Sequence, residues 1–250
     1  VVFLPHLAFN MLNHEQTFLS PQLCNGSRKN VSYDLRTNSL RGIDQQATNI
    51  PALQNMMQRY AKASQKLLTD LFPQYNSHVL HARTSYRPVE IAGRVPRSYR
   101  KDDTRLHVDA FPSTPTQGGR ILRMFSNVNP HGQARVWRIG EDFTQVVYKF
   151  APQVPQQLFG IAAIQKLLKI TRSYRTLYDH YMLNIHNIMK SDLHYQSHVT
   201  QQEVRFPPGS TWLVYTDQVS HAALAGQFLL EQTFYLPVEA MMDPELSPLK

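Results

Sequence analysis

The chain has 250 residues, 42% of them hydrophobic and 18% charged, which is typical of a globular protein and unlike a disordered chain. Its single cysteine, Cys24, excludes an internal disulfide framework and a thiolate-rich zinc site. No run of residues approaches the roughly 20 apolar positions that a membrane-spanning helix needs. We therefore expect a single domain over residues 1–250 that is soluble or lies on a membrane surface.

The net charge of +8 is unevenly distributed along the chain. A basic cluster between positions 83 and 105 contains Arg83, Arg87, Arg94, Arg97, Arg100, Lys101 and Arg105. Such a cluster attracts phosphates, whether on nucleic acid, on lipid headgroups or on a phosphorylated glycolipid. The alternative is a solvated loop whose cations pair with Glu90, Asp102 and Asp103. Charge alone leaves both interpretations open.

Residues 1–75 are predicted to form an N-terminal portion that is helical or irregular. The first fifty residues show no firm hydrophobic period. From Ile50 to Leu71, apolar residues recur at steps of three and four, which predicts an amphipathic helix. Pro51 suits the first turn of this helix, and Pro73 ends it.

Short β-like runs follow, separated by proline and glycine turns. Strands are predicted near residues 78–83, 106–111, 120–127 and 135–139. Apolar residues at helical spacing from about 159 to 190 predict a helical insertion over residues 155–195. β-rich segments return at 211–215 and 227–236, on either side of His221. This order predicts an α+β fold with a mainly β core, a double-stranded β-helix (jelly-roll) barrel buttressed by helices.

The sequence Leu106-His107-Val108-Asp109 is the segment most informative about chemistry. In a strand, residues i and i+2 project from the same face, so His107 and Asp109 would point together. An imidazole beside a carboxylate supplies two ligands of the facial triad of non-haem iron(II) oxygenases. His221 follows a Pro-Gly turn and a β-rich segment, which makes it the candidate third ligand. The alternative is a surface His-Asp pair on an edge strand, because this short pattern is common by chance.

The other histidines fit a metal site less well. His180 and His186 are six residues apart in the helical insertion, which places them on different helix faces, so we interpret both as ordinary helix residues. The His-Glu-x-x-His pattern of zinc peptidases is absent.

An oxygenase that uses 2-oxoglutarate also needs a cation for the distal carboxylate, and arginine suits this role best. Many such enzymes carry the arginine shortly after the distal histidine, where this chain has Glu231 and Gln232. Arg120 and Arg123 are the alternatives. Three residues apart on a strand, they face opposite sides, and we favour Arg123.

Longer motifs cover most of the chain from about residue 80: TSYRPVEI at 84–91, RKDDTRLHVDAFPS at 100–113, RILR at 120–123, RVW at 135–137 and SHAALAGQFLLEQTFYLP at 220–237. Together they resemble the Kdo (3-deoxy-D-manno-oct-2-ulosonic acid) hydroxylase family. That resemblance implies an Fe(II)/2-oxoglutarate-dependent dioxygenase that uses O2, with ascorbate supporting turnover. It implies hydroxylation of C3 of Kdo to give the Ko sugar, with release of succinate and CO2.

Carried over by position, the resemblance makes His107, Asp109 and His221 the metal ligands. It places Arg123, Trp137 and Arg87 around 2-oxoglutarate.

The resemblance also suggests the substrate and its location. The implied substrate is Kdo2-lipid A, met at the inner membrane of a Gram-negative bacterium by a cytoplasmic enzyme in peripheral contact, with no nucleic-acid partner. Kdo carries a carboxylate and lipid A carries phosphates, so Arg94, Arg97 and Arg100 of the basic cluster are the candidate substrate-binding residues.

Two other functions remain open from the sequence. One keeps the iron centre but acts on a protein or a nucleobase, in which case the basic cluster would serve nucleic acid. Against it, the chain shows no interleaved aromatic and basic residues of the kind that stack bases. The other is a non-catalytic jelly-roll module that binds a sugar or lipid. Metal content distinguishes this binding module from an iron oxygenase, because a binding module needs no iron and consumes no 2-oxoglutarate.

Overall fold

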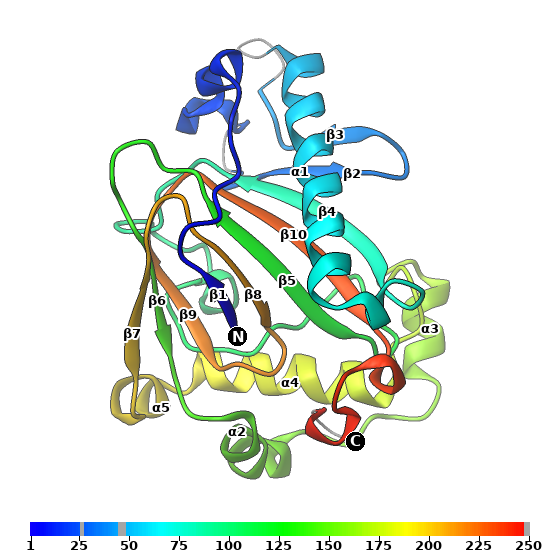
Figure 1. Ribbon diagram of the computed structural model, residues 1–250. Coiled ribbons are helices and arrows are strands. Elements are labelled where there is room, and N and C mark those ends of the chain that lie inside the picture. The colour runs from blue at the N-terminus through cyan, green and yellow to red at the C-terminus, as the bar shows by residue number, and fades with distance from the viewer. Residues whose placement is uncertain (26–27, 45–48, 248–250) are drawn as a thin grey trace.

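The computed structural model describes residues 1–25, 28–44 and 49–247 (Figure 1). Its strands form two antiparallel sheets, one of seven strands in the order β1-β8-β5-β10-β4-β2-β3 and one of three in the order β7-β6-β9. The strands are β1 (Val2–Leu4), β2 (Val31–Asp34), β3 (Ser39–Arg41), β4 (Leu80–Arg87), β5 (Arg120–Asn127), β6 (Arg135–Ile139), β7 (Gln202–Phe206), β8 (Thr211–Tyr215), β9 (His221–Ala225) and β10 (Leu229–Leu236).

Aromatic side chains fill the space between the two sheets. Trp212 of β8 stacks on Phe206 of β7, with 3.9 Å between the ring centroids. Trp137 of β6 meets Phe125 of β5 edge to face at 5.2 Å. Large rings in contact bury much apolar area and join the sheets. The result is the jelly-roll core, with flanking helices, that the sequence predicts.

Helix α1 (Ile50–Leu71) lies across the seven-stranded sheet, over β4 and β10 (Figure 1). The side chain of Asn49 accepts a hydrogen bond from the Ala52 amide at its start. Leu53, Met56 and Tyr60 are fully buried against the sheet, which is the face that their spacing predicts. The prediction of this helix is confirmed with the same bounds.

Four shorter helices cover the other side of the core: α2 (Phe143–Phe150), α3 (Ile161–Leu167), α4 (Leu177–Ser191) and α5 (Leu193–His198). The apolar pattern from 159 to 190 therefore belongs to two helices. Lys169, between them, has a positive φ of 55°, which no helix accommodates. Thr176 then starts α4 through a reciprocal capping box with Asp179. Short 3-10 turns complete the helical structure at Asn13–Phe18, Pro21–Leu23, Pro73–Tyr75, Tyr99–Lys101, Ala151–Gln153, Val238–Ala240 and Pro244–Leu246.

The strand predictions are confirmed in part. The bounds predicted for 120–127, 135–139 and 211–215 are those of β5, β6 and β8. The strand predicted at 106–111 is wrong, because only His107 there forms a bridge, to His221. β1, β2 and β3 lie in the N-terminal portion, where no period predicted a strand. Among the described residues, no helix is both long enough and apolar enough to cross a membrane.

Candidate active site

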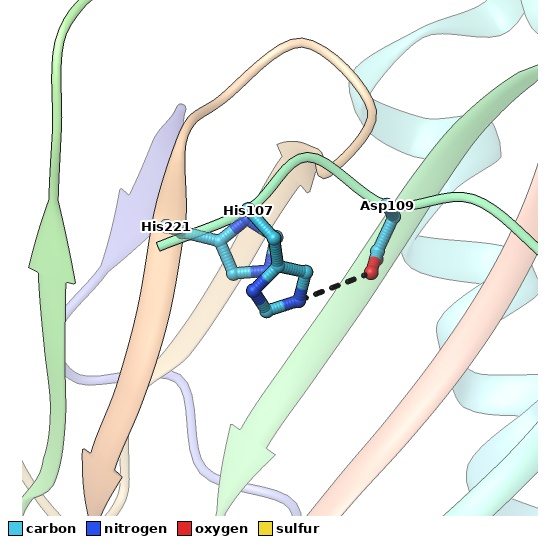
Figure 2. A group of neighbouring side chains, drawn as sticks. All are labelled: His107, Asp109 and His221. Carbon is cyan, nitrogen blue, oxygen red and sulfur yellow. Dashed lines mark ion pairs between the residues drawn. The ribbon is translucent and has the colours of Figure 1, made fainter. Parts of the chain in front are cut away.

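His107, Asp109 and His221 meet at one point of the jelly-roll core (Figure 2). One ligand atom from each residue lies within 4.8 Å of those of the other two. Nε2 of His107 is 3.7 Å from Oδ1 of Asp109, and all three residues are buried. The structure thus brings together the three residues that the sequence predicts as metal ligands, although they are 114 positions apart at the extremes (221 − 107).

Backbone pairing replaces the predicted strand as the device that positions the ligands. The amides and carbonyls of His107 and His221 exchange two hydrogen bonds, of 3.0 and 2.9 Å. The Asp109 amide donates to the carbonyl oxygen of Thr216 at 2.9 Å. The chain between these two points is irregular, so Asp109 reaches the histidines without the alternation of a strand. The side chains converge as predicted, but the local reason for it differs.

Each histidine ring is oriented by its own main chain. Nδ1 of His107 is 2.7 Å from the carbonyl oxygen of Arg105, and Nδ1 of His221 is 2.8 Å from that of Val219. A carbonyl oxygen only accepts, so Nδ1 carries the proton in both rings. Nε2 of each ring is then the unprotonated nitrogen, which is the form that binds a metal.

The electrostatics of the site favour the same protonation states. Burial and the charge of Lys190 hold the pKa of His107 well below its ordinary value, and burial also lowers the pKa of His221. Burial alone would raise the pKa of Asp109, but the neighbouring Arg123 guanidinium and the two histidines hold it well below the ordinary carboxyl value. Two neutral imidazoles and one ionised carboxylate are therefore present near neutral pH. This donor set fits iron(II), and Oδ2 of Asp109 is buried, has no hydrogen bond in the described structure and lies 3.3 Å from the Arg123 guanidinium.

The site opens into a pocket of about 730 Å³. One side, which we call the β wall, is formed by Arg123 of β5, Glu231 of β10 and Arg87 of β4. Arg123 bridges Asp109 at 3.3 Å and Glu231 at 3.4 Å. Nε of Arg87 donates a hydrogen bond to Glu231 at 2.8 Å, and Nη2 of Arg87 forms an ion pair with the same carboxylate oxygen at 2.7 Å. Arg123 lines the pocket whereas Arg120 does not, which agrees with the alternation of the strand.

Arg135 and Trp137 of β6 also line the pocket. Trp137 stacks on His221, with ring centroids 5.0 Å apart, and its indole Nε1 has no hydrogen-bond partner among the described residues. Arg135 is buried and donates to the Gly226 carbonyl oxygen at 2.8 Å, while its Nε is unpartnered within the same described residues. Burial and the charge of Arg87 lower the pKa of Arg135. Unsatisfied donors of this kind are suited to an anionic ligand.

The opposite side, the helical wall, comes from α4 and the segments next to it. His186 lines the pocket with its ring 5.0 Å from that of His107, and its Nδ1 is 2.8 Å from the Val108 carbonyl oxygen. His186 is thus a residue of helix α4 outside the group of metal ligands, as predicted, but its place in the lining of the pocket was not predicted. Lys190, one turn further along α4, is 2% exposed and donates to the Arg100 carbonyl oxygen at 3.2 Å. Arg100 and Lys101, from the turn that contacts α4, and Lys29, which forms an ion pair with Asp103, complete the cationic lining of the pocket.

The family model for 3-deoxy-D-manno-oct-2-ulosonic acid (Kdo) hydroxylase matches residues 1–250. The chain belongs to the Kdo hydroxylase family. No curated protein matches it.

The Kdo hydroxylase fold is also found in the similar solved structures. The chain is 50% identical to the Kdo hydroxylase KdoO, a non-haem Fe(II) α-ketoglutarate-dependent dioxygenase, in complex with α-ketoglutarate and Fe(III), with a TM-score of 0.93. The apo structure of KdoO gives 51% identity and 0.94, and its complex with succinate and Fe(III) gives 50% and 0.93. Each comparison covers 99% of this chain and 83% of the other.

In this Kdo hydroxylase family member, the three arginines predicted to bind substrate lie in different surroundings. Arg100 lines the pocket. Arg94 is held by the carbonyl oxygens of Val89 and Glu90 and by an ion pair with Asp103 at 3.3 Å, and neither Arg94 nor the exposed Arg97 lines the pocket. The ion pair with Asp103 agrees with the alternative that part of the basic cluster is structural.

Proposed function

We propose that this chain is an Fe(II)/2-oxoglutarate-dependent dioxygenase that hydroxylates C3 of Kdo in Kdo2-lipid A to give Ko. The observation that carries the proposal is the buried His107-Asp109-His221 triad at the base of a cation-lined pocket, in a member of the Kdo hydroxylase family. Two histidines and one carboxylate on one side of a metal leave positions open for ligands. The similar protein KdoO is a non-haem Fe(II) α-ketoglutarate-dependent dioxygenase, which is the same cofactor chemistry.

The triad would hold iron(II) through Nε2 of both histidines and the Asp109 carboxylate. Iron(II), when bound, supplies oxygen activation coupled to the oxidation of 2-oxoglutarate to succinate and CO2. Arg123 keeps Asp109 ionised and oriented through their 3.3 Å contact. Trp137 fixes the plane of the His221 ring by stacking on it. Ascorbate, in this proposal, supports turnover.

The β wall and β6 would bind 2-oxoglutarate. Arg87 and Arg123 already share Glu231 and Asp109, so their charges are largely balanced. Among the described residues Arg135 forms no ion pair, which makes it the cation best suited to the distal carboxylate. The free indole N–H of Trp137 would donate to the same co-substrate. We therefore add Arg135 to the predicted set of Arg123, Trp137 and Arg87.

The helical wall would receive the sugar. Lys29, Arg100, Lys101 and Lys190 outnumber Asp103, the acid that lines this part of the pocket. Kdo carries a carboxylate, and lysine binds such an anion as a point charge. The substrate is a glycolipid, so we further propose that the enzyme acts from the cytoplasm in peripheral contact with the inner membrane.

The test is an aerobic incubation of the purified protein with iron(II), 2-oxoglutarate, ascorbate and Kdo2-lipid A, read by mass spectrometry. We expect one added oxygen on the Kdo portion and one succinate for each product. His107→Ala should abolish both, while His180→Ala, whose ring contacts the Pro155 carbonyl outside the pocket, should retain them. Succinate without sugar product would discard the substrate and keep the oxygenase. Absence of both, with no bound iron, would favour a binding module.

A further inference from the structure

The segment between positions 158 and 177 exposes an unusual number of large apolar side chains. We call these residues the apolar surface: Leu158, Phe159, Ile164, Leu167, Leu168, Ile170, Tyr174 and Leu177. They are eight of the nineteen exposed large hydrophobic residues in the described structure, and they fall within twenty positions of the chain. Phe159 is fully exposed and Leu167 is 80% exposed. Scattered exposed apolar residues are normal, but a concentration of this kind marks an interaction site.

The charges within this segment all have one sign. Lys166, Lys169 and Arg172 are exposed among the apolar residues. The sequence contains no Asp or Glu between Asp142 and Asp179. Leu, Ile and Phe beside Lys and Arg form the composition of surfaces that lie in the headgroup region of an anionic membrane. Facing copies of the chain would bring these cations against one another, which disfavours self-association through this surface.

Hydrogen bonds attach the apolar surface to the segment that leads away from Asp109. The Arg172 amide donates to the Ser113 carbonyl oxygen at 2.9 Å, and the Ser173 hydroxyl donates to that of Pro115 at 3.1 Å. The Arg175 guanidinium donates to the Pro112 carbonyl oxygen, and Pro112 lines the pocket. The apolar surface is therefore fixed to the lining of the pocket, at the end of α4 opposite α5 (Figure 1).

We propose that the apolar surface inserts into the headgroup region of an anionic lipid bilayer and holds the mouth of the pocket against it. The orientation toward a glycolipid rests on the proposed function, whereas the insertion itself does not. Membrane contact is thereby assigned to the segment around α3, and not to Arg94 and Arg97, one of which is tied to its own loop. Cations of the segment provide attraction at a distance, and the apolar side chains provide the buried area.

The experiment is co-sedimentation of the full chain with vesicles of phosphatidylethanolamine and phosphatidylglycerol. The combined variant Phe159→Ser, Leu167→Ser, Leu168→Ser should bind at least about tenfold more weakly, because it removes large side chains from the inserted face. A matched control removes three apolar side chains exposed elsewhere, with Tyr148→Ser, Leu193→Ser and Leu246→Ser, and should bind like the unmodified protein.

A second pair of variants tests the charges. Lys166→Glu with Lys169→Glu should abolish the preference for anionic vesicles over phosphatidylcholine, whereas Arg36→Glu with Lys62→Glu, also on the exposed surface, should not. Equal binding by the serine variant and the unmodified protein would overturn the proposal. So would a concentration-dependent dimer that the serine variant disrupts without any vesicle binding.

Activity on vesicle-embedded Kdo2-lipid A separates this inference from the function. If the serine variant loses turnover on vesicles but retains it on a water-soluble Kdo fragment, the result supports membrane insertion of the apolar surface. Vesicle binding that depends on the apolar surface in a protein that never oxidises Kdo would leave the surface standing and reject the proposed function.

Discussion

Both walls of the pocket contain buried charged side chains, but the two walls differ in how far those charges are paired with opposite charges. On the β wall, Arg87 and Arg123 face Glu231 and Asp109, so two cations meet two acids within 3.4 Å. On the helical wall, Lys190 is buried with a carbonyl oxygen as its hydrogen-bond acceptor. Burial lowers the pKa of Lys190 to about 8. One wall is neutralised from within, and the other has an excess of positive charge.

This difference indicates separate roles. A neutralised network holds its members in place whatever is bound, so the β wall is suited to positioning the metal-binding carboxylate. An uncompensated buried cation is costly until an anion arrives, so the helical wall is suited to a charged substrate. Arg135 of β6 lies near the β wall but shares the incomplete pairing of Lys190. Substitutions on the β wall should therefore lower stability, whereas substitutions of Arg135 and Lys190 should weaken the binding of an anionic ligand.

Breaking the neutralised wall should have the largest effect. Glu231→Gln removes the acid shared by Arg87 and Arg123 and leaves two cations beside each other in a buried site. We expect the free energy of unfolding to fall by about 3 kcal/mol, measured by denaturant titration. The control is Glu203→Gln, whose exposed pair with Arg205 should contribute no more than about 0.5 kcal/mol. Equal small losses in both variants would contradict the network.

Arg135→Gln tests the cation that the β strands leave unpaired. We expect the apparent KM for 2-oxoglutarate to rise about 100-fold, because a charge-assisted contact to the distal carboxylate is lost. The KM for Kdo should change little. Arg138→Gln is the matched control on the same strand, since Arg138 pairs with Gln201 and does not line the pocket. A rise in the KM for Kdo alone would contradict this assignment and would place the sugar, not 2-oxoglutarate, next to Arg135.

Lys190→Met tests the helical wall. We expect kcat/KM for the Kdo substrate to fall about tenfold to thirtyfold, with kcat/KM for 2-oxoglutarate retained. The free energy of unfolding should not fall, because the variant removes a buried cation that has no acid partner. Lys62→Met, exposed on α1, is the control.

The pH dependence of the same residue has a defined sign. Lys190 is charged below its pKa of about 8 and neutral above it, so kcat/KM for Kdo should decline as the pH rises through about 8. Lys190→Arg should move this decline to higher pH, since a guanidinium keeps its charge. An identical decline in Lys190→Met would assign the titration to another group.

The sequence predicts the parts of the fold whose ends are marked by proline, glycine or a cap. Helix α1 and strands β5, β6 and β8 have the predicted bounds. The segment around His107 does not, because a single bridge to His221 and one hydrogen bond from the Asp109 amide replace a strand ladder. Both arrangements bring the side chains together, so the ligand geometry could be anticipated from a local structure that is wrong.

The rest of the pocket could not be inferred in this way. Helical spacing shows that His186 and Lys190 share one side of α4, but not that this side meets residue 107. In the sequence, Glu231 stands where many 2-oxoglutarate oxygenases carry an arginine, and its role could not be inferred from that position. Only the pairing of β10 with β4 and β5 explains it, since that pairing places Glu231 between Arg87 and Arg123. The register between distant strands determines which charged side chains form ion pairs, and no local hydrophobic period encodes that register.

The smallest expected effect comes from Trp137, which stacks on His221 and lines the pocket proposed to bind the co-substrate. Trp137→Phe keeps a ring to stack on His221 but removes the unpartnered indole N–H. One neutral hydrogen bond contributes about 1 kcal/mol, so the KM for 2-oxoglutarate should rise about fivefold while iron affinity is unchanged. Trp212→Phe, whose buried Nε1 is also unpartnered in the described structure but does not line the pocket, is the control. If iron affinity falls and the KM for 2-oxoglutarate does not, Trp137 acts by orienting His221, and the co-substrate is held by charge alone.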